Sequence, residues 1–356
     1  MSRKLSRRKA GFHSRTQGLA LVELMISLVL GLVIVGAVTG IMLSNIQGFR
    51  TTRGLAQVQD AARVGFELLA RDIRQAGNVP CGNDIAVVNI LNPAQNAIIP
   101  WQYDWDNAVK GFGGGTSLVG VTNQIAGTES LVMLSGQGSN TYMTEYNSAA
   151  GSADFVAGPA GNSLRDGDVL LVCNERLGTI FQMVNAPGGT GKIESNTGTG
   201  GSSPQPGNCS VNFGEFFGSC PPNGAANGVQ APYAPNTVIA QLSSTAWYVG
   251  DNGRPGEGGR SLYMVRLSNN AGDAELNSIE IASGVTDLSF RFRLVDTADF
   301  KDVDDIGAAE WADVNAIEVS MSLLSQDQNI STSSAVDDGR LGRSFTSVVA
   351  IRSRSL

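Results

Sequence analysis

One apolar segment near the N-terminus constrains this chain more than any other feature. From Leu19 to Leu43 the sequence contains a single charged residue, Glu23. A helix that spans a bilayer needs about 20 consecutive apolar residues, so the segment predicts one membrane-spanning helix. A carboxylate in such a helix costs about 2.5–3.5 kcal/mol near the bilayer centre. We therefore expect Glu23 to have a function that depends on a partner.

The residues before this segment, Met1 to Gly18, are basic and include no acidic residue. Positive charge before the first apolar segment keeps this end of the chain in the cytoplasm. A secretory signal peptide has a shorter apolar stretch, which is followed by small residues at the cleavage site. Here the small residue Gly18 precedes the apolar segment. Cleavage after Gly18 would remove the basic leader and leave the helix intact.

The order of residues from Gly18 to Met25 resembles the class III signal of type IV prepilins. Glu23 stands at the fifth position after Gly18, where that family has its glutamate, whereas Leu19 replaces the usual phenylalanine. The resemblance implies that a prepilin peptidase cleaves residues 1–18 between Gly18 and Leu19. It also implies that the peptidase methylates the new α-amine of Leu19.

Glu23 would then be close to an amine. The glutamate of one subunit can approach the α-amine at Leu19 of its neighbour when subunits stack. Such a pair avoids two unpaired charges in an apolar filament core, where lone charges are very costly. The alternative is a plain membrane anchor with a stray carboxylate near its end.

A helical pattern continues beyond the apolar segment, so we expect one helix over residues 19–80. Residues 19–45 would form its membrane or filament-core part and residues 46–77 an amphipathic part. The apolar residues of the second part recur every three or four positions, the spacing of one buried stripe. That stripe consists of Leu55, Val58, Ala62, Phe66, Leu69 and Ile73. The other sides carry the charged residues, among them Arg71, Asp72 and Arg74. Gly77 and Pro80 are typical helix stop signals.

The segment from Phe66 to Gly77, followed by Cys81, is similar to the PilW family of minor pilins. Ser44 and Asn45, at the end of the apolar run, add to the resemblance, as does the later pair of segments 284–292 and 316–323. The resemblance implies a type IV pilus minor pilin that acts in a priming or tip complex. Twitching motility and cell adhesion would depend on it.

Residues 81–356 have a different composition, rich in Gly, Asn, Ser and Thr, and predict a β-rich extracytoplasmic head. Alternating apolar residues mark the two clearest strands, 288–294 and 317–323. Other strands are expected at 85–90, 130–134, 168–173, 179–184, 238–242, 246–249, 261–267 and 345–352. Surface loops are expected at 108–115 and 147–161, and a flexible loop at about 185–235. The predicted fold class is α+β, a long N-terminal helix packed on this head.

The four cysteines lie beyond the membrane segment, on the side where disulfides persist. Four cysteines allow three connectivities. We favour Cys81–Cys173, which would join the helix end to a strand, together with Cys209–Cys220. A zinc site is the weaker alternative, because no CxxC pair exists and the single histidine, His13, lies in the leader.

No residue pattern predicts an enzyme or a cofactor. The only histidine lies in the leader, so a Ser-His or Cys-His nucleophile pair is not available to the mature chain. The glycine-rich segment 186–193 lacks the first Gly and the Ser or Thr of a P-loop. An acidic cluster is a weak calcium candidate; besides Asp296 it contains Asp299, Asp302, Asp304 and Asp305. A solvated acidic loop is the more ordinary interpretation.

Charge gives a further limit. Loss of the six basic residues of the leader changes the formal net charge from −7 to −13, so nucleic acid is not expected to bind through bulk charge.

The expected location is the inner membrane, with a single pass and a periplasmic head, and then the pilus on the cell surface. The resemblance implies other minor and major pilins, the prepilin peptidase, the assembly platform and a tip adhesin as partners. The nearest alternative is a pseudopilin of a type II secretion system, which has the same leader and helix. An alternative of another class is an adhesin whose head binds a surface ligand.

Overall fold

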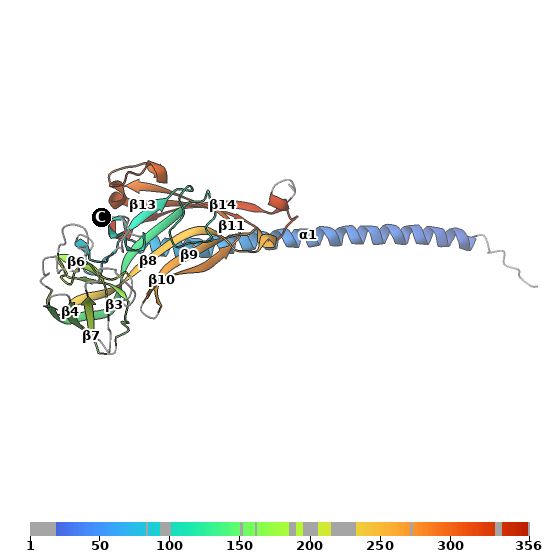
Figure 1. Cartoon of the computed structure of the whole chain (residues 1–356). Coiled ribbons are helices and arrows are strands. Elements are labelled where there is room, and N and C mark those ends of the chain that lie inside the picture. Colours follow the sequence, from blue (N-terminus) through green and yellow to red (C-terminus); the bar gives the residue numbers. More distant parts are fainter. Residues whose placement is uncertain are drawn as a thin grey trace, which may run out of the picture. The chain divides into compact units, whose positions relative to one another are not determined.

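The computed structural model of this chain describes residues 19–82, 85–92, 101–149, 152–160, 162–184, 190–194, 206–214, 233–270, 273–331 and 337–354 (Figure 1). One long helix, α1 (Leu19–Gln75), precedes a series of strands and short 3-10 turns. The chain divides into two compact units, one up to Arg53 and one from Gly54 onward. Helix α1 begins in the first unit and ends in the second, which we call the head. The predicted α+β class is confirmed.

Helix α1 ends at Gln75, a few residues before the expected limit at residue 80 and just before the predicted stop signal Gly77. Gly77 adopts a left-handed conformation with φ of 68°, which glycine adopts without steric cost. Its N–H donates to the carbonyl oxygen of Leu134 at 2.7 Å, and the N–H of Asn78 donates to the carbonyl of Gln75 at 3.1 Å. The chain therefore leaves the helix by joining a strand of the head.

The larger sheet of the described head has ten strands. Its central path is β1-β6-β5-β8-β3-β4-β7, with β2 paired to β3, β9 to β8, and β10 to β9. The pairs are antiparallel except for β1 with β6, which is parallel. The strands are β1 (Ala86–Asn89), β2 (Val109–Phe112), β3 (Ser130–Ala149), β4 (Ser152–Gly158), β5 (Val169–Cys173), β6 (Leu177–Gln182), β7 (Thr190–Glu194), β8 (Thr237–Asp251), β9 (Arg260–Asn270) and β10 (Asp273–Ser283).

A second, four-stranded sheet has the order β12-β11-β13-β14. Its strands are β11 (Val285–Leu294), β12 (Phe300–Asp302), β13 (Val314–Leu324) and β14 (Gly342–Ala350). Gly284 alone joins β10 of the larger sheet to β11, with φ of 81°. A Cβ at this position would collide with the carbonyl oxygen of Leu324. Glycine therefore allows the chain to change sheets within one residue.

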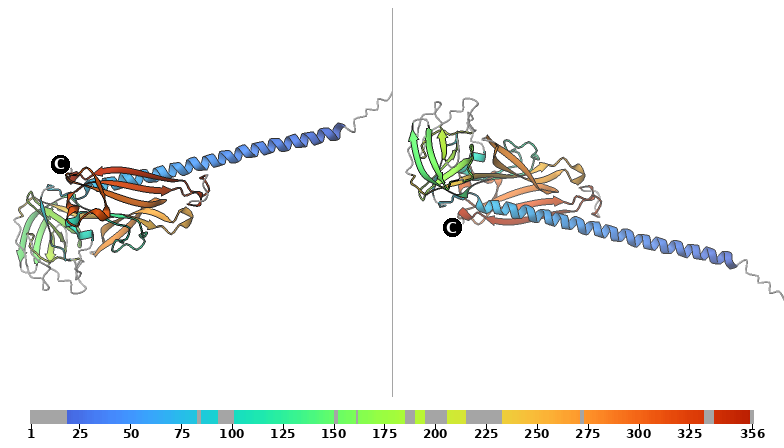
Figure 2. Two further views of the ribbon diagram at one scale, coloured as in Figure 1. Left: turned by 90° about the horizontal axis from the view of Figure 1, so that it is seen from above. Right: turned by 90° about the horizontal axis from the view of Figure 1, so that it is seen from below.

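The main hydrophobic core lies between the end of α1 and both sheets. Leu69 and Ile73 of α1 pack in one cluster with Phe290 of β11, Val319 of β13 and Trp247 of β8. Figure 2 shows the last part of the helix, from Gly54 onward, beside the orange and red strands of the C-terminal third. A separate cluster beneath β3, β4, β5 and β6 contains Phe155, Phe181 and Phe213. The head therefore has more than one hydrophobic centre.

The last residues of the chain pack against the helix end. In the short turn η7 (Arg352–Arg354), the hydroxyl of Ser353 donates to the carbonyl of Ala76 at 2.8 Å. The guanidinium of Arg354 donates to the carbonyls of Trp311 at 2.8 Å and Val314 at 3.2 Å. The C-terminal segment thus helps to hold the end of α1 in the head.

Several expected loops and strand limits are wrong. The segments 108–115 and 147–161 contain β2 and β4, and the strands expected at 238–242 and 246–249 are one continuous strand, β8. Most of the flexible loop expected at 185–235 lies outside the described residues. Within it, residues 190–194 form strand β7, so the expectation of a loop is wrong there. The described segment 206–214 is a buried connection, because Val211 and Phe213 pack in the second cluster and the Asn208 amide donates to the Gln182 carbonyl at 2.7 Å.

Candidate functional site

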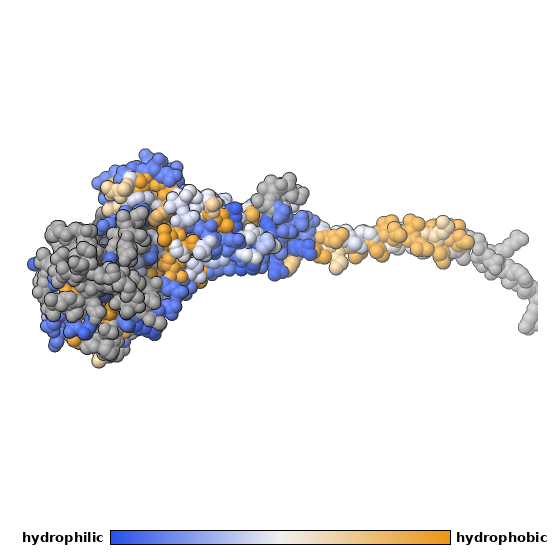
Figure 3. Space-filling view, in the orientation of Figure 1, coloured by the Kyte–Doolittle hydropathy of each residue, from blue (hydrophilic) through white to orange (hydrophobic). Residues whose placement is uncertain are grey.

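The first part of α1 exposes apolar side chains on all sides. Large hydrophobic residues from Leu21 to Leu43 are exposed, and Figure 3 shows orange, hydrophobic side chains over this part of the helix. The helix is long and apolar enough to cross a membrane, with a mean hydropathy of 2.6 in its most apolar stretch. Such a surface is expected to be covered by lipid or by other helices. It therefore has the properties of a membrane anchor or a signal sequence.

Polar groups in this part of α1 are mostly satisfied by the helix itself. The hydroxyls of Ser27 and Thr39 donate to the carbonyls of Glu23 at 2.7 Å and Val35 at 2.8 Å. The carboxylate of Glu23 is the exception, since within residues 19–82 and the other described segments no hydrogen bond or ion pair reaches it. Leu19 is the first helical residue, whereas Gly18 lies outside the described residues. A partner of the Glu23 carboxylate would therefore have to come from another molecule.

Small residues on the same part of the helix leave space for close approach. A Cβ built at Gly31, Gly36 or Gly40 would have no heavy atom within 4 Å. In membranes, small residues of this kind allow neighbouring helices to pack closely. This part of α1 can therefore accept other helices as well as lipid.

The predicted stripe of the second part of α1 faces the head. Val58, Ala62, Leu69 and Ile73 are buried. Leu55 is half-buried, and Phe66 is a half-buried side chain packed against the main core. Burial of an aliphatic side chain such as that of Leu69 contributes about 1.5–3 kcal/mol. The stripe thus fixes the end of α1 in the head.

The expectation that Asp72 lies on the polar, exposed side of the helix is wrong. Its side chain is buried, with one oxygen accepting from the indole N–H of Trp247 at 3.1 Å and the other 3.5 Å from the guanidinium of Arg71. Burial raises the pKa of this carboxyl, while the hydrogen bond from Trp247 and the charges of Arg266 and Arg71 oppose the shift. The helical spacing does not predict the burial of Asp72, because its partner Trp247 lies on a strand that is far away in the sequence.

The predicted disulfide between Cys81 and Cys173 is confirmed, with Cα atoms 5.9 Å apart. It joins the segment after α1 to the last residue of β5. A stable disulfide indicates an oxidising compartment, so it favours a head outside the cytoplasm. Cys209 is buried, and the pairing predicted for it involves Cys220, which lies outside the described residues.

The acidic residues between β11 and β13 do not gather into a metal site. The carboxylate of Asp302 pairs with the guanidinium of Arg291 at 3.0 Å. Asp304 and Asp305 belong to the short turn η4 (Val303–Asp305), and Asp299 immediately precedes β12. Among the residues that the structure describes, no group of three or more His, Cys, Asp or Glu side chains could hold a metal ion.

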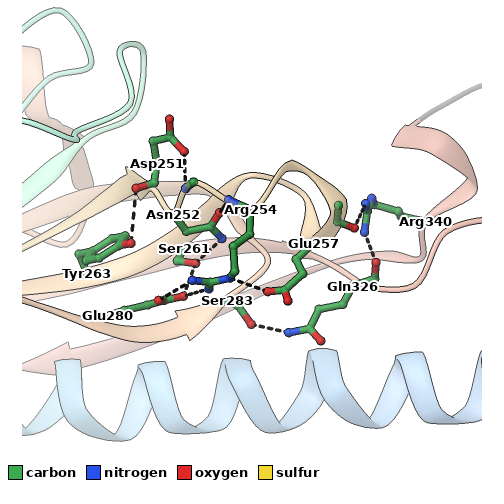
Figure 4. A network of polar contacts seen from close by, with 12 residues as sticks. Asp251, Asn252, Arg254, Glu257, Ser261, Tyr263, Glu280, Ser283, Gln326 and Arg340 are labelled. Carbon is green, nitrogen blue, oxygen red and sulfur yellow. Dashed lines mark hydrogen bonds and ion pairs between the residues drawn. The ribbon is translucent and has the colours of Figure 1, made fainter.

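A polar network holds the β8–β9 turn to the rest of the head (Figure 4). The guanidinium of Arg254 pairs with Glu257 at 2.7 Å and with Glu280 of β10, and the hydroxyl of Ser261 donates to Glu280 at 2.7 Å. Hydrogen bonding from Arg254 lowers the pKa of Glu280. These charges are satisfied by one another, which is the arrangement of a structural clamp.

Arg340 extends this network from a buried position. Its guanidinium donates to the carbonyls of Ser325 at 2.9 Å, Gly256 at 2.7 Å and Gln326. The amide of Gln326 in turn donates to the hydroxyl of Ser283 at 2.6 Å. No sequence pattern predicts this role of Arg340, because all three acceptors are backbone groups that come together only in the folded head.

Comparison with known proteins gives no further assignment. No family model matches this chain, and no curated protein matches it either.

Proposed function

We propose that this chain is a minor pilin of a type IV pilus and acts by assembly, without catalysis. One observation carries the proposal: the exposed apolar part of α1 has a single carboxylate, Glu23, five positions after the cleavage site predicted at Gly18. A membrane anchor needs only apolar surface. A carboxylate that no group of the described chain pairs with is costly in lipid, and an intermolecular partner accounts for it.

Maturation comes first in the proposed sequence of events. The prepilin peptidase cleaves between Gly18 and Leu19 on the cytoplasmic side and methylates the α-amine of Leu19. The leader and its positive charges are lost, and α1 stays in the inner membrane. The head folds in the periplasm, where the Cys81–Cys173 disulfide can form.

Assembly then transfers the apolar part of α1 from lipid to a bundle of similar helices. The positions of Gly31, Gly36 and Gly40 allow close helix packing, and Glu23 pairs with the α-amine of a neighbouring pilin. The charge pair sets the axial position of each subunit, because displacement along the bundle would separate two opposite charges in an apolar core.

We further propose a PilW-type role in the complex that primes the pilus or lies at its tip. The large head, with two sheets and more than one hydrophobic cluster, supports this role. A subunit that repeats along a shaft needs a compact head, whereas a tip subunit is free of that limit. Twitching motility and adhesion would then depend on the chain indirectly.

The N-terminus of the protein from native membranes tests the proposal. Intact mass and N-terminal sequencing are expected to give a chain that starts at a methylated Leu19. A chain that retains Met1, or that starts beyond Leu43, would contradict it and make the protein an anchored or secreted head.

A deletion strain separates the two pilin-like roles. Loss of surface pili supports the type IV pilus. Normal pili combined with loss of secreted hydrolases would instead indicate a type II secretion pseudopilin. Normal pili with loss of surface attachment would indicate an adhesin head.

A further inference from the structure

A cleft in the head lies beside the last turn of α1. It has a volume of about 530 Å³, and its walls come from α1, β3, β9 and the C-terminal turn η7. Ligand sites of proteins commonly have volumes of about 300–1,000 Å³. The cleft is therefore large enough for a small molecule or for a side chain of a partner.

The charge of this cleft is opposite to that of the chain. Its walls include the guanidinium groups of Arg71, Arg74, Arg266 and Arg352 and one carboxylate, that of Asp72, a net formal charge of +3. The whole chain has a formal net charge of −7. Charges of one sign that line a concave surface raise the local concentration of ions of the opposite sign.

Asp72 offsets only one of the four positive charges of the cleft. Its carboxylate accepts from Trp247 at 3.1 Å, lies 3.5 Å from the guanidinium of Arg71, and also interacts with the charge of Arg266. Arg74 has no ion pair with any described residue, whereas Arg71 pairs with Asp72 and Arg352 also has an interaction partner. Arg74 and Arg266 are therefore the two guanidinium groups best placed to bind a ligand.

Arg266 gives an independent reason to expect a ligand. Its Nε atom is buried and has no hydrogen-bond acceptor among the described residues. Leaving a buried charged donor without an acceptor is unfavourable, and such groups in folded proteins usually bind an ion or water. The position of Arg266 in the wall of an arginine-lined cleft favours an anion.

We infer that this cleft binds an oxyanion, which is a carboxylate or phosphate group. Guanidinium groups bind both through two parallel N–H···O hydrogen bonds. Arg74 and Arg266 supply the charge, and the side-chain amide of Gln137 in the same wall can donate a further hydrogen bond. The inference is independent of the proposed role in a pilus, because the cleft lies entirely within the head.

Isothermal titration of the full chain in a neutral maltoside detergent tests the inference. Sodium phosphate and sodium succinate are titrated separately at low salt, and we expect a dissociation constant of about 1 mM or lower for at least one of them. Tighter binding of phosphate identifies a phosphate ligand, and tighter binding of succinate identifies a carboxylate ligand. Added sodium chloride is expected to weaken either interaction.

Three single substitutions locate the binding. Arg266→Gln and Arg74→Gln are each expected to weaken binding about tenfold or more, because each removes charge-assisted hydrogen bonds. Arg176→Gln, at an exposed arginine outside the cleft, is the matched control and should bind like the parent. Arg74 is exposed in the last turn of α1, so its variant decides the question if Arg266→Gln fails to fold.

Two results would overturn the inference. One is the absence of binding heat for both anions at about 10 mM, well above the expected dissociation constant. The other is binding by the folded Arg74→Gln variant that equals that of the Arg176→Gln control.

Discussion

The Cys81–Cys173 disulfide is expected to contribute a large part of the stability of the head. The two cysteines are 92 residues apart in the sequence. Closing a loop of that length in the unfolded chain stabilises the folded state by about 4–5 kcal/mol in the chain-entropy model. Most domains have a free energy of unfolding of only about 5–15 kcal/mol. Loss of this one cross-link should therefore have a large effect.

The test is the double substitution Cys81→Ala and Cys173→Ala. Alanine avoids a buried hydroxyl at position 173, which lies in a hydrophobic cluster with Leu171 and Ala240. Lost packing of the sulfur atoms adds about 1 kcal/mol to the loss of cross-linking. We therefore expect the free energy of unfolding to fall by about 5–6 kcal/mol in total.

Urea denaturation followed by tryptophan fluorescence measures this change, since Trp101, Trp247 and Trp311 are buried in the head. The control is the single substitution Cys81→Ala kept under reducing conditions, which breaks the cross-link but keeps Cys173 as a free thiol. Both variants should lose similar stability. If the free energy of unfolding of the double variant falls by less than about 1 kcal/mol, the chain-entropy reasoning is refuted, because lost packing of the sulfur atoms alone would account for that decrease.

Three further predictions concern single side chains. Glu23→Gln should abolish incorporation into sheared pili while the amount in the membrane stays at the parental level; normal incorporation would exclude the charge pair. Leu69→Ala should lower the free energy of unfolding by about 2–5 kcal/mol, and the exposed Val64→Ala by much less, so equal losses in urea denaturation would contradict the buried stripe. Because the pKa of Asp72 is raised in the folded state, the folded protein binds this proton more tightly than the unfolded chain does, so the free energy of unfolding should fall as pH rises through the ordinary range of an aspartate and above it. The free energy of unfolding of Asp72→Asn should therefore rise relative to that of the parent between pH 3 and pH 7, whereas that of the exposed control Asp60→Asn should not. If the difference between Asp72→Asn and the parent is the same at both pH values, this reasoning is wrong.

The sequence predicts the elements whose surroundings are simple. Helix α1 follows from the three-and-four spacing of its apolar residues and from Gly77. Strands β11 and β13 follow from alternation, because each has one buried face and one more exposed face. When one face of a helix or strand packs against a core, apolar residues recur along the sequence with the period of that element.

Other elements lack such a pattern for physical reasons. Most described residues of β10 are exposed or half-buried, so no alternation marks it, and backbone pairing with β9 forms the strand. β8 seemed to be two strands because serine and threonine interrupt its apolar residues. Strands pair with β8 on both sides, and of these polar residues Ser244 and Thr245 are buried.

The candidate sites differ in the same way. Gly18, Leu19 and Glu23 lie within one short segment, so the sequence alone is enough to propose them. The arginine cleft joins α1, β9 and the C-terminal turn η7, which are far apart in the sequence. The burial of Asp72 likewise depends on Trp247 of β8. Sites of this kind can be recognised only once the fold is known.

The packing of the last strands on α1 has a consequence for the time course of synthesis. The helix is made early, but its buried stripe is covered by β11, β13 and the turn at Ser353, which are made last. At about 5–20 residues per second, this delay lasts roughly tens of seconds. Until then the stripe of Leu69 and Ile73 stays open to other apolar surfaces. We therefore expect the newly made chain to need a chaperone until its C-terminal strands are complete.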